Sequence, residues 1–441
     1  MPFSSMVLIM TLLLCINSIP SLYAQTLEPL GFEYFKLDNG LKVVLLKTDS
    51  PSPVTVNLSY NIGFRLEQRG EAGFAHLAEH VWMASNKIRK GIVNASTRYD
   101  HTSFYAVLPP DRLRKYLKQE ALRMRNSTVR QKILTSQKYA LNDEHKLTVT
   151  NHPYGGFPWQ RMPKIAFENW QNAHDYFGDP HLISNASVED IQNFLNRYYI
   201  PNNAVLVVMG NFNSASTRSW IMKYFGSIGQ KPLPQKPDIS EPIQVKEKTA
   251  VITDGLIRRP ALSVAYKIPE RTSPYYFAMG LIDQMLVKGK DSRLYQLLVE
   301  QKKYTDRVNG GINYLGNMFT HNGPMLWMTH MVYDPSVHKD SLIATIEQAI
   351  GSIQREINDS MLEQAKWGVM ESFKQMREER NGLAVSDMLA CFALFDDDPA
   401  QYNYIESSFN KVDASMIRQT LTNWLKPSNR TVLVLSPKNP E

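Results

Sequence analysis

Apolar residues recur with two different periods along the chain, and these periods separate predicted strands from predicted helices. From Val54 to Tyr60 every second residue is apolar, which is typical of a strand with one buried face. From Leu113 to Met124 apolar residues recur at intervals of three and four, which predicts an amphipathic helix. Strands precede runs of helices and a further strand follows them, so the pattern predicts an α+β fold with mostly antiparallel sheets.

One such pattern occurs twice. The segment "IQNFLNRYYIPNNAVLVVMG" begins at Ile191 and "IRQTLTNWLKPSNRTVLVLS" begins at Ile417. Each predicts an amphipathic helix, a Pro-x-Asn turn and a buried strand. The offset is constant, since 417 − 191 and 427 − 201 both equal 226. Two common helix–turn–strand units could match by coincidence, but the ungapped register favours a duplication.

Residues 230–247 lie between the two copies. They contain several prolines and show no apolar period, which predicts an extended linker. We therefore expect two homologous halves, residues 25–229 and residues 248–441. Each half should be a mostly antiparallel sheet with helices packed on one face.

The composition excludes some classes of protein. The chain has 441 residues, of which 43% are hydrophobic and 21% are charged, as is ordinary for a globular protein of two or more domains. The formal net charge is +7, but the basic residues are scattered and form no long Lys/Arg run. The sequence therefore gives no indication of a nucleic-acid partner.

The first 24 residues differ from the rest, because they carry no charged side chain. Their apolar core is shorter than the roughly 20 residues that a membrane-spanning helix needs. It is typical of a secretory signal with Ala24 as the cleavage residue, while a retained anchor and a buried helix are the alternatives. Only Cys391 remains after removal, so no internal disulfide can form. We expect export to a periplasm, or secretion, without stable membrane insertion.

The candidate chemistry begins with His76-Leu77-Ala78-Glu79-His80. On a helix the two histidines lie one turn apart on the same face, so both imidazoles can reach one zinc ion. Glu79 lies beside that ion as a candidate general base. Two surface histidines near a solvated glutamate are the alternative, but the surrounding residues are apolar. With no cysteine nearby, an open catalytic zinc site is favoured over a closed structural one.

A catalytic zinc site needs a third protein ligand. Asp143, Glu144 and His145 are adjacent in the chain, and their composition alone cannot choose among them. The other histidines of this region lack partners at ligand spacing and are interpreted as surface or loop residues: His101, His145, His152, His174 and His181.

The motif resembles the inverted zinc motif of the pitrilysin/insulinase-like peptidases, or inverzincins, which are related to mitochondrial processing peptidase. The segment from Asn151 to Gly155, "NHPYG", resembles one that follows the third ligand at a fixed step, and this register implies Glu144. "GKDSRLYQLLVEQ" from Gly289 extends the resemblance into the second half. Length and signal segment resemble a bacterial exported short form of the family.

The resemblance also implies roles for other residues. The segment from Asn94 resembles the family's edge strand, where Asn94 and Ala95 pair with the substrate main chain. Gln137 takes a place close to the metal that is often Glu in relatives. One departure is that 144 − 80 = 64 residues separate the second histidine from the third ligand. This is shorter than usual, and the shortfall falls between Ala84 and Asn94.

The sequence therefore predicts a zinc metalloendopeptidase with one Zn²⁺ per chain, held by His76, His80 and Glu144. The resemblance implies two halves that face each other like a clamshell and enclose small or unstructured polypeptides, bound as an added edge strand. The alternatives are a non-catalytic assembly or binding subunit on the same scaffold and, more weakly, a metal-storage protein. The second-half equivalent of the motif, Tyr276–Val287, has no histidine. Relatives commonly associate, so we expect a homodimer, or a heterodimer with a homologue that lacks the motif.

Overall fold

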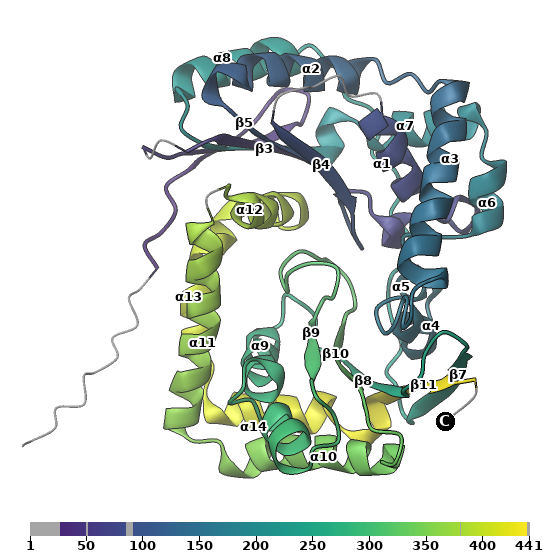
Figure 1. Ribbon diagram of the computed structural model, residues 1–441. Coiled ribbons are helices and arrows are strands. Elements are labelled where there is room, and N and C mark those ends of the chain that lie inside the picture. The colour runs from purple at the N-terminus through teal and green to yellow at the C-terminus, as the bar shows by residue number, and fades with distance from the viewer. Residues whose placement is uncertain (1–26, 50–51, 85–90, 380, 439–441) are drawn as a thin grey trace, which may run out of the picture.

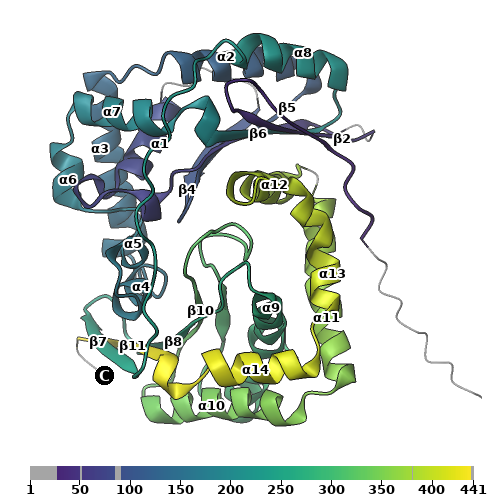
Figure 2. The same ribbon diagram turned by 180° about the vertical axis from the view of Figure 1, so that it is seen from behind.

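The computed structural model describes residues 27–49, 52–84, 91–379 and 381–438. The expected signal segment, residues 1–24, lies outside the described residues. Two halves, each built around one sheet, face each other (Figure 1). Residues 230–247 run as an extended segment from the first half to the second, as the view from behind shows (Figure 2). Among the described residues, no helix combines the length and the apolar character needed to cross a membrane.

The first sheet has the strand order β1-β2-β6-β3-β5-β4. All its neighbouring strands are antiparallel except β2 and β6, which are parallel. Its strands are β1 (Glu33–Lys36), β2 (Lys42–Lys47), β3 (Val54–Tyr60), β4 (Ile92–Thr97), β5 (Thr102–Leu108) and β6 (Ala204–Gly210).

The second sheet has the order β7-β11-β8-β10-β9, in which only β7 and β11 are parallel. Its strands are β7 (Lys248–Asp254), β8 (Ala261–Lys267), β9 (Asn309–Ile312), β10 (Leu326–Val332) and β11 (Arg430–Pro437). This arrangement repeats the β2-β6-β3-β5-β4 part of the first sheet, parallel pair included. The predicted α+β class with mostly antiparallel sheets is therefore confirmed.

Helices cover the outer face of each sheet, and in the first half these are chiefly α2 and α8 (Figure 1). The helices are α1 (Phe74–Ala84), α2 (Leu113–Arg125), α3 (Gln131–His145), α4 (Arg161–Ala166), α5 (Trp170–Ala173), α6 (Pro180–Asn185), α7 (Val188–Tyr198), α8 (Ser214–Phe225), α9 (Pro274–Val287), α10 (Lys339–Glu356), α11 (Asp359–Glu378), α12 (Leu383–Phe395), α13 (Ile405–Asn410) and α14 (Ala414–Trp424). The predicted amphipathic helix corresponds to α2, whose periodic apolar residues are buried.

Each half also supplies a helix to the inner face of the other half's sheet. Helix α12 of the second half packs on β3 and β6, and α4 of the first half packs on β8 and β11. The prediction that Val54–Tyr60 is half-buried was therefore wrong, because all of β3 is buried. The hydroxyl of Thr55, on the face turned away from the first half's own helices, donates a hydrogen bond to the carbonyl of Asn381.

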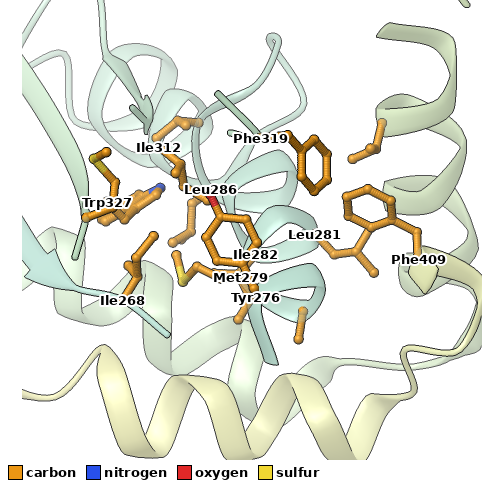
Figure 3. Close-up of a cluster of buried hydrophobic side chains, with 14 of the residues drawn as sticks. Ile268, Tyr276, Met279, Leu281, Ile282, Leu286, Ile312, Phe319, Trp327 and Phe409 are labelled. Carbon is orange, nitrogen blue, oxygen red and sulfur yellow. The ribbon is translucent and has the colours of Figure 1, made fainter. Parts of the chain in front are cut away.

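The largest core is centred on α9 of the second half (Figure 3) and extends to residues of the first sheet such as Val44 and Val205. Tyr276 and Ile282 of this helix are buried with Trp327 of β10 and Phe409 of α13. The position equivalent to the metal motif is thus part of an apolar core. The one acidic residue of α9, Asp283, lies near the end of this helix and accepts a hydrogen bond from the indole of Trp327 at 2.8 Å.

The repeated Pro-x-Asn turn makes the same contacts in both copies. Asn203 donates a side-chain hydrogen bond to the carbonyl of Tyr198 at 2.9 Å, and Asn429 donates one to the carbonyl of Trp424 at 2.6 Å. Each asparagine also bonds the end of the neighbouring strand, through the carbonyls of Asn61 and Lys267. The asparagine therefore joins a helix end to a strand end, which explains why that residue recurs at the 226-residue offset.

Replacing Asn203 or Asn429 with Ala should each destabilise the protein by about 1–3 kcal/mol, because buried carbonyls lose their donors. Thermal unfolding of the two variants measures this. Asn423→Ala is the control, since Asn423 is exposed on α14, and its effect should stay within about 0.5 kcal/mol. Equal unfolding temperatures for all three variants would contradict the structural role of the turn.

A second junction between the halves involves α12. His101 lies just before β5, and its Nε2 is 3.3 Å from Oδ1 of Asp387 on α12. The thiol of Cys391, one turn further along, lies 3.7 Å from the same nitrogen. Burial raises the pKa of this thiol well above its ordinary value, so it stays protonated. The contact between His101 and Asp387 joins the two halves.

Burial alone would raise the pKa of Asp387, but the hydrogen bond from His101 and the charges of His101 and Arg98 outweigh burial and lower it. The carboxylate therefore stabilises the fold fully above about pH 4, and this contribution is lost as the pH falls through the lowered pKa. Asp387→Asn should cost roughly 1.5–3 kcal/mol near pH 7 and less below pH 4. Unfolding temperatures across pH, with the exposed Asp306→Asn as control, test this. A pH-independent difference would contradict it.

Candidate metal centre

The N-terminus of α1, the helix that carries the motif, is held in place by Gly73 and Glu67. Gly73 precedes α1 with a φ of +94°, and a Cβ there would lie 2.7 Å from the side chain of Ile183. The buried carboxylate of Glu67 accepts hydrogen bonds from the main-chain nitrogens of Gly73 at 2.9 Å and Ala75 at 2.6 Å. An anion at a helix N-terminus satisfies its free N–H groups and offsets its dipole. Glu67 and Gly73 thereby fix the direction in which α1 presents His76 and His80.

The three predicted ligands come together where α1 packs against α3. His76 is buried, and its Nε2 lies 3.2 Å from Nε2 of His80 on the next turn. One carboxylate oxygen of Glu144, near the end of α3, lies 3.2 Å from His80 Nε2 and 3.8 Å from His76 Nε2. These three atoms therefore converge on one point in space.

The structure separates Glu144 from its two neighbours. The side chain of Asp143 is 70% exposed and faces Lys146 at 3.7 Å. The ring of His145 packs edge-on against Phe177, with the ring centres 4.8 Å apart. Of the three adjacent candidates that composition could not rank, only Glu144 reaches the histidines.

The donor set fits a zinc ion. Tetrahedral zinc with Zn–N and Zn–O bonds of about 2.0–2.2 Å holds its ligand atoms about 3.3 Å apart. The separations of 3.2, 3.2 and 3.8 Å lie close to that value. Two imidazoles and one carboxylate leave a fourth position open, as catalytic zinc sites do.

The environment sets the charge of each ligand. Burial lowers the pKa of His76 to about 3, so this imidazole is neutral and can donate a lone pair to a metal. Burial also opposes charge on His80, but its hydrogen bond with Glu144 and the charge of Glu79 outweigh burial and raise its pKa. Burial raises the pKa of Glu144, yet the two histidines outweigh burial and lower it, so Glu144 is a carboxylate.

Glu79 faces the same site without joining the three ligand atoms. It is buried and accepts a hydrogen bond from the hydroxyl of Thr97 at 2.7 Å. Burial raises its pKa to about 7, although the Thr97 bond and His80 act in the opposite direction. A carboxylate with a pKa near neutrality can both accept and return a proton, which is the requirement for a general acid–base group.

The remaining predicted residues also lie near the three ligands. Asn94 is exposed and Ala95 half-buried on β4, which is the last strand in the sheet order, so its outer edge pairs with no other strand of the described residues. Gln137 on α3 lies close enough to His80 for its side chain to raise the pKa of that imidazole.

A pocket of about 360 Å³ connects all of these groups except Gln137. It is lined by His76, Glu79, His80, Asn94, Ala95, Ser96, Thr97, Arg98, Glu144, Tyr176 and Leu315. Sequence reasoning missed Ser96, Thr97, Arg98, Tyr176 and Leu315. The period of two along β4 places Thr97 on the same face as Ala95, so a signal for Thr97 exists in the sequence. Tyr176 and Leu315 come from distant segments and carry no such signal.

Two of the other histidines lie outside helices and strands, as expected, but they are not on the surface. His101 and His174 are buried, and His174 donates its Nε2 proton to the carbonyl of Phe64 at 2.6 Å. Each finds its partners on a segment remote in sequence, which spacing alone cannot show. His152 and His181 are exposed, as expected.

Comparison with known proteins finds relatives that are named as zinc proteases. Residues 185–369 match the family described as the Peptidase M16 inactive domain. The zinc protease PqqE of Helicobacter pylori is 25% identical over 443 residues, and the match covers 95% of each chain. The matched domain and this relative support the resemblance to the pitrilysin/insulinase-like M16 peptidases that the motif indicated.

Solved structures show the same M16 fold. The crystal structure of a protease from Helicobacter pylori has a TM-score of 0.83 at 23% identity, covering 93% of this chain and all of the other. The periplasmic protease PqqL from Escherichia coli has a TM-score of 0.73 at 15% identity. This chain covers 48% of PqqL, so it spans about half of that protein's length.

Proposed function

We propose that this chain is a zinc-dependent endopeptidase that hydrolyses small or unstructured polypeptides. The observation that carries the proposal is the convergence of His76, His80 and Glu144, with Glu79 beside them and the outer edge of β4 along the same pocket. His76, His80 and Glu144 are proposed to hold one zinc ion. When bound, zinc supplies a Lewis acid that polarises the scissile carbonyl and acidifies the attacking water.

The residues of the chain perform the proton transfers. Glu79 accepts a proton from the attacking water and returns it to the leaving amine. Thr97 fixes the rotamer of Glu79 through the 2.7 Å hydrogen bond and keeps the free carboxylate oxygen available. Gln137 orients the ring of His80.

The substrate adds as a strand to the outer edge of β4, at Asn94 and Ala95. Main-chain hydrogen bonds supply affinity for any extended peptide, and side-chain pockets supply preference. Because the two halves face each other across this edge (Figure 1), a bound polypeptide must be small or locally unfolded to reach it.

The test is the metal content of the purified mature chain together with hydrolysis of an unstructured peptide. We expect about one zinc per chain, loss of hydrolysis after chelation and recovery on adding zinc back. A chain that retains zinc but cleaves no unstructured peptide would contradict the endopeptidase function.

The same assay addresses the alternative of a non-catalytic binding subunit. The match to the M16 inactive domain covers residues 185–369, which do not include the four residues of the motif and third ligand. A binding subunit would capture peptides without cleaving them, whether or not it holds zinc. The presence of all four residues in one pocket favours catalysis.

We place the protein outside the cytoplasm, in a periplasm. The apolar N-terminal segment supports export, and the similar PqqL is a periplasmic protease. Fractionation of cells that express the full chain, with N-terminal sequencing of the exported form, tests both the compartment and cleavage after Ala24.

We further propose that the chain acts as a homodimer, or as a heterodimer with a homologue that lacks the motif. The resemblance implies that the second half supplies an arginine and a tyrosine that grip the substrate after a Ser-Arg-Leu segment, but in this chain Val299 stands at the place of that arginine. Arg293 of the segment itself pairs with Glu356 at 2.8 Å. Specific activity should therefore fall several-fold on dilution below the dissociation constant of the dimer, as mass action requires. Light scattering across the same dilution series measures association, and a fully active monomer would contradict the proposal.

A further inference from the structure

One side chain in the metal pocket comes from the second half of the chain. The hairpin between β9 and β10, residues 313–325, rises from the second sheet toward β4 (Figure 1). Near its start, Leu315 lines the pocket together with residues of the first half. The pocket is therefore completed only when this hairpin contacts the first half.

The hairpin is held in one shape by its own hydrogen bonds. Asn313, with a φ of +55°, donates its side-chain amide to the carbonyl of Asn317 at 2.8 Å. The side-chain oxygen of Asn313 accepts from the main-chain nitrogen of Leu315 at 3.3 Å. The side chain of Asn317 in turn accepts from the main-chain nitrogen of Phe319, which is buried in the second-half core. These bonds fix the position of Leu315 relative to the second half.

Other contacts fix the same hairpin to the first half. The main-chain nitrogen of Asn322 donates to a carboxylate oxygen of Asp100 at 2.7 Å. Asp100 also pairs with the buried guanidinium of Arg65 at 3.6 Å. Gly323 lies directly against Arg65, and a Cβ at Gly323 would overlap this guanidinium. Since both ends of the hairpin are restrained, Leu315 has a defined place opposite β4.

Leu315 differs in chemical character from the rest of the pocket lining. Most of the lining is charged or hydroxyl-bearing, and Ala95 offers little apolar surface. Leu315 is the one large aliphatic side chain that lines the pocket within the described part of the chain. An apolar substrate side chain beside the reacting bond could be buried favourably against Leu315 and the ring of Tyr176. Contact with the other, polar side chains of the pocket would cost those side chains their hydrogen bonds to water.

Building on the proposed peptidase function, we propose that Leu315 determines specificity by selecting an apolar side chain next to the scissile bond. The residue acts through contact area with the substrate. The second half thereby takes part in substrate choice, although the three proposed zinc ligands all belong to the first half. A contact of this size raises kcat/KM for a substrate with an apolar side chain over one with a polar side chain by about tenfold or more.

The experiment uses peptide pairs that are identical except for Leu or Gln at the residue before, or after, the scissile bond. The wild type should prefer Leu by about tenfold at one of these positions. Leu315→Asn keeps the size of the side chain and removes its apolar character, so the preference should fall to about one. Leu315→Ala should reduce it partly. Zinc content and unfolding temperature of each variant report whether the pocket and the fold remain intact.

Leu256 offers a matched control, because it is 49% exposed in the turn between β7 and β8 of the same half. Leu256→Asn and Leu256→Ala should leave the preference unchanged. An unchanged Leu-to-Gln ratio in both Leu315 variants would overturn the role of Leu315 while leaving the peptidase function intact. Absence of hydrolysis by the zinc-loaded wild type would overturn both proposals.

Discussion

Replacing Glu79 with Gln should abolish peptide hydrolysis and leave zinc bound. The amide keeps the shape of the side chain and can still bond Thr97, but it cannot take a proton from water. General acid–base catalysis contributes about 10²–10⁴-fold to the rate, so kcat should fall by at least that range. Zinc analysis and single-turnover hydrolysis on the same preparation measure the two effects separately.

The control for this variant is Glu168→Gln, which makes the same chemical change at an exposed carboxylate of the first half outside the pocket. It should retain wild-type zinc content and hydrolysis. Hydrolysis by Glu79→Gln near the wild-type rate would remove the assigned role of Glu79. Loss of zinc from this variant would instead show that Glu79 also supports the metal.

The local parts of the fold and of the site could be predicted from the sequence. The motif puts His76 and His80 one helical turn apart, and the structure places their Nε2 atoms 3.2 Å apart. The duplicated segment predicted a helix, a turn and a strand in each half, and α7 with β6 and α14 with β11 confirm them. Such features depend on residues that are close in sequence, where side-chain period and turn chemistry determine structure.

The parts that failed depend on contacts between remote segments. Periodicity predicted one buried face for Val54–Tyr60, yet α12 from the second half covers the other face. His101 has no ligand-like neighbour in sequence, but α12 brings Asp387 to it. Leu315 is similarly unremarkable in the sequence and reaches the pocket only because the second half faces the first. A single sequence does not show which segments of one half pack on the other half. These contacts could therefore be identified only from the structure.

The predicted third ligand, Glu144, could be identified from the sequence only in part. Sixty-four residues separate it from His80 (144 − 80), and composition left Asp143, Glu144 and His145 equal. The register of "NHPYG" implied Glu144, and the structure supplies the physical reason. Helix α3 runs beside α1, and of the three residues only Glu144 projects toward it.

Replacing Glu144 with Gln should therefore weaken zinc binding by about 100-fold or more. Loss of an outer partner of a ligand already costs 10–100-fold in affinity, and a direct carboxylate ligand also offsets the charge of the ion. Asp143→Asn and His145→Ala are matched controls on the same helix end, and they should bind zinc as the wild type does. Zinc retained after dialysis against a series of chelators of increasing strength gives the order of affinities. If Asp143→Asn lost zinc and Glu144→Gln retained it, the ligand set would be wrong, because the 3.2 Å approach of Glu144 to His80 would then have no role in holding the metal.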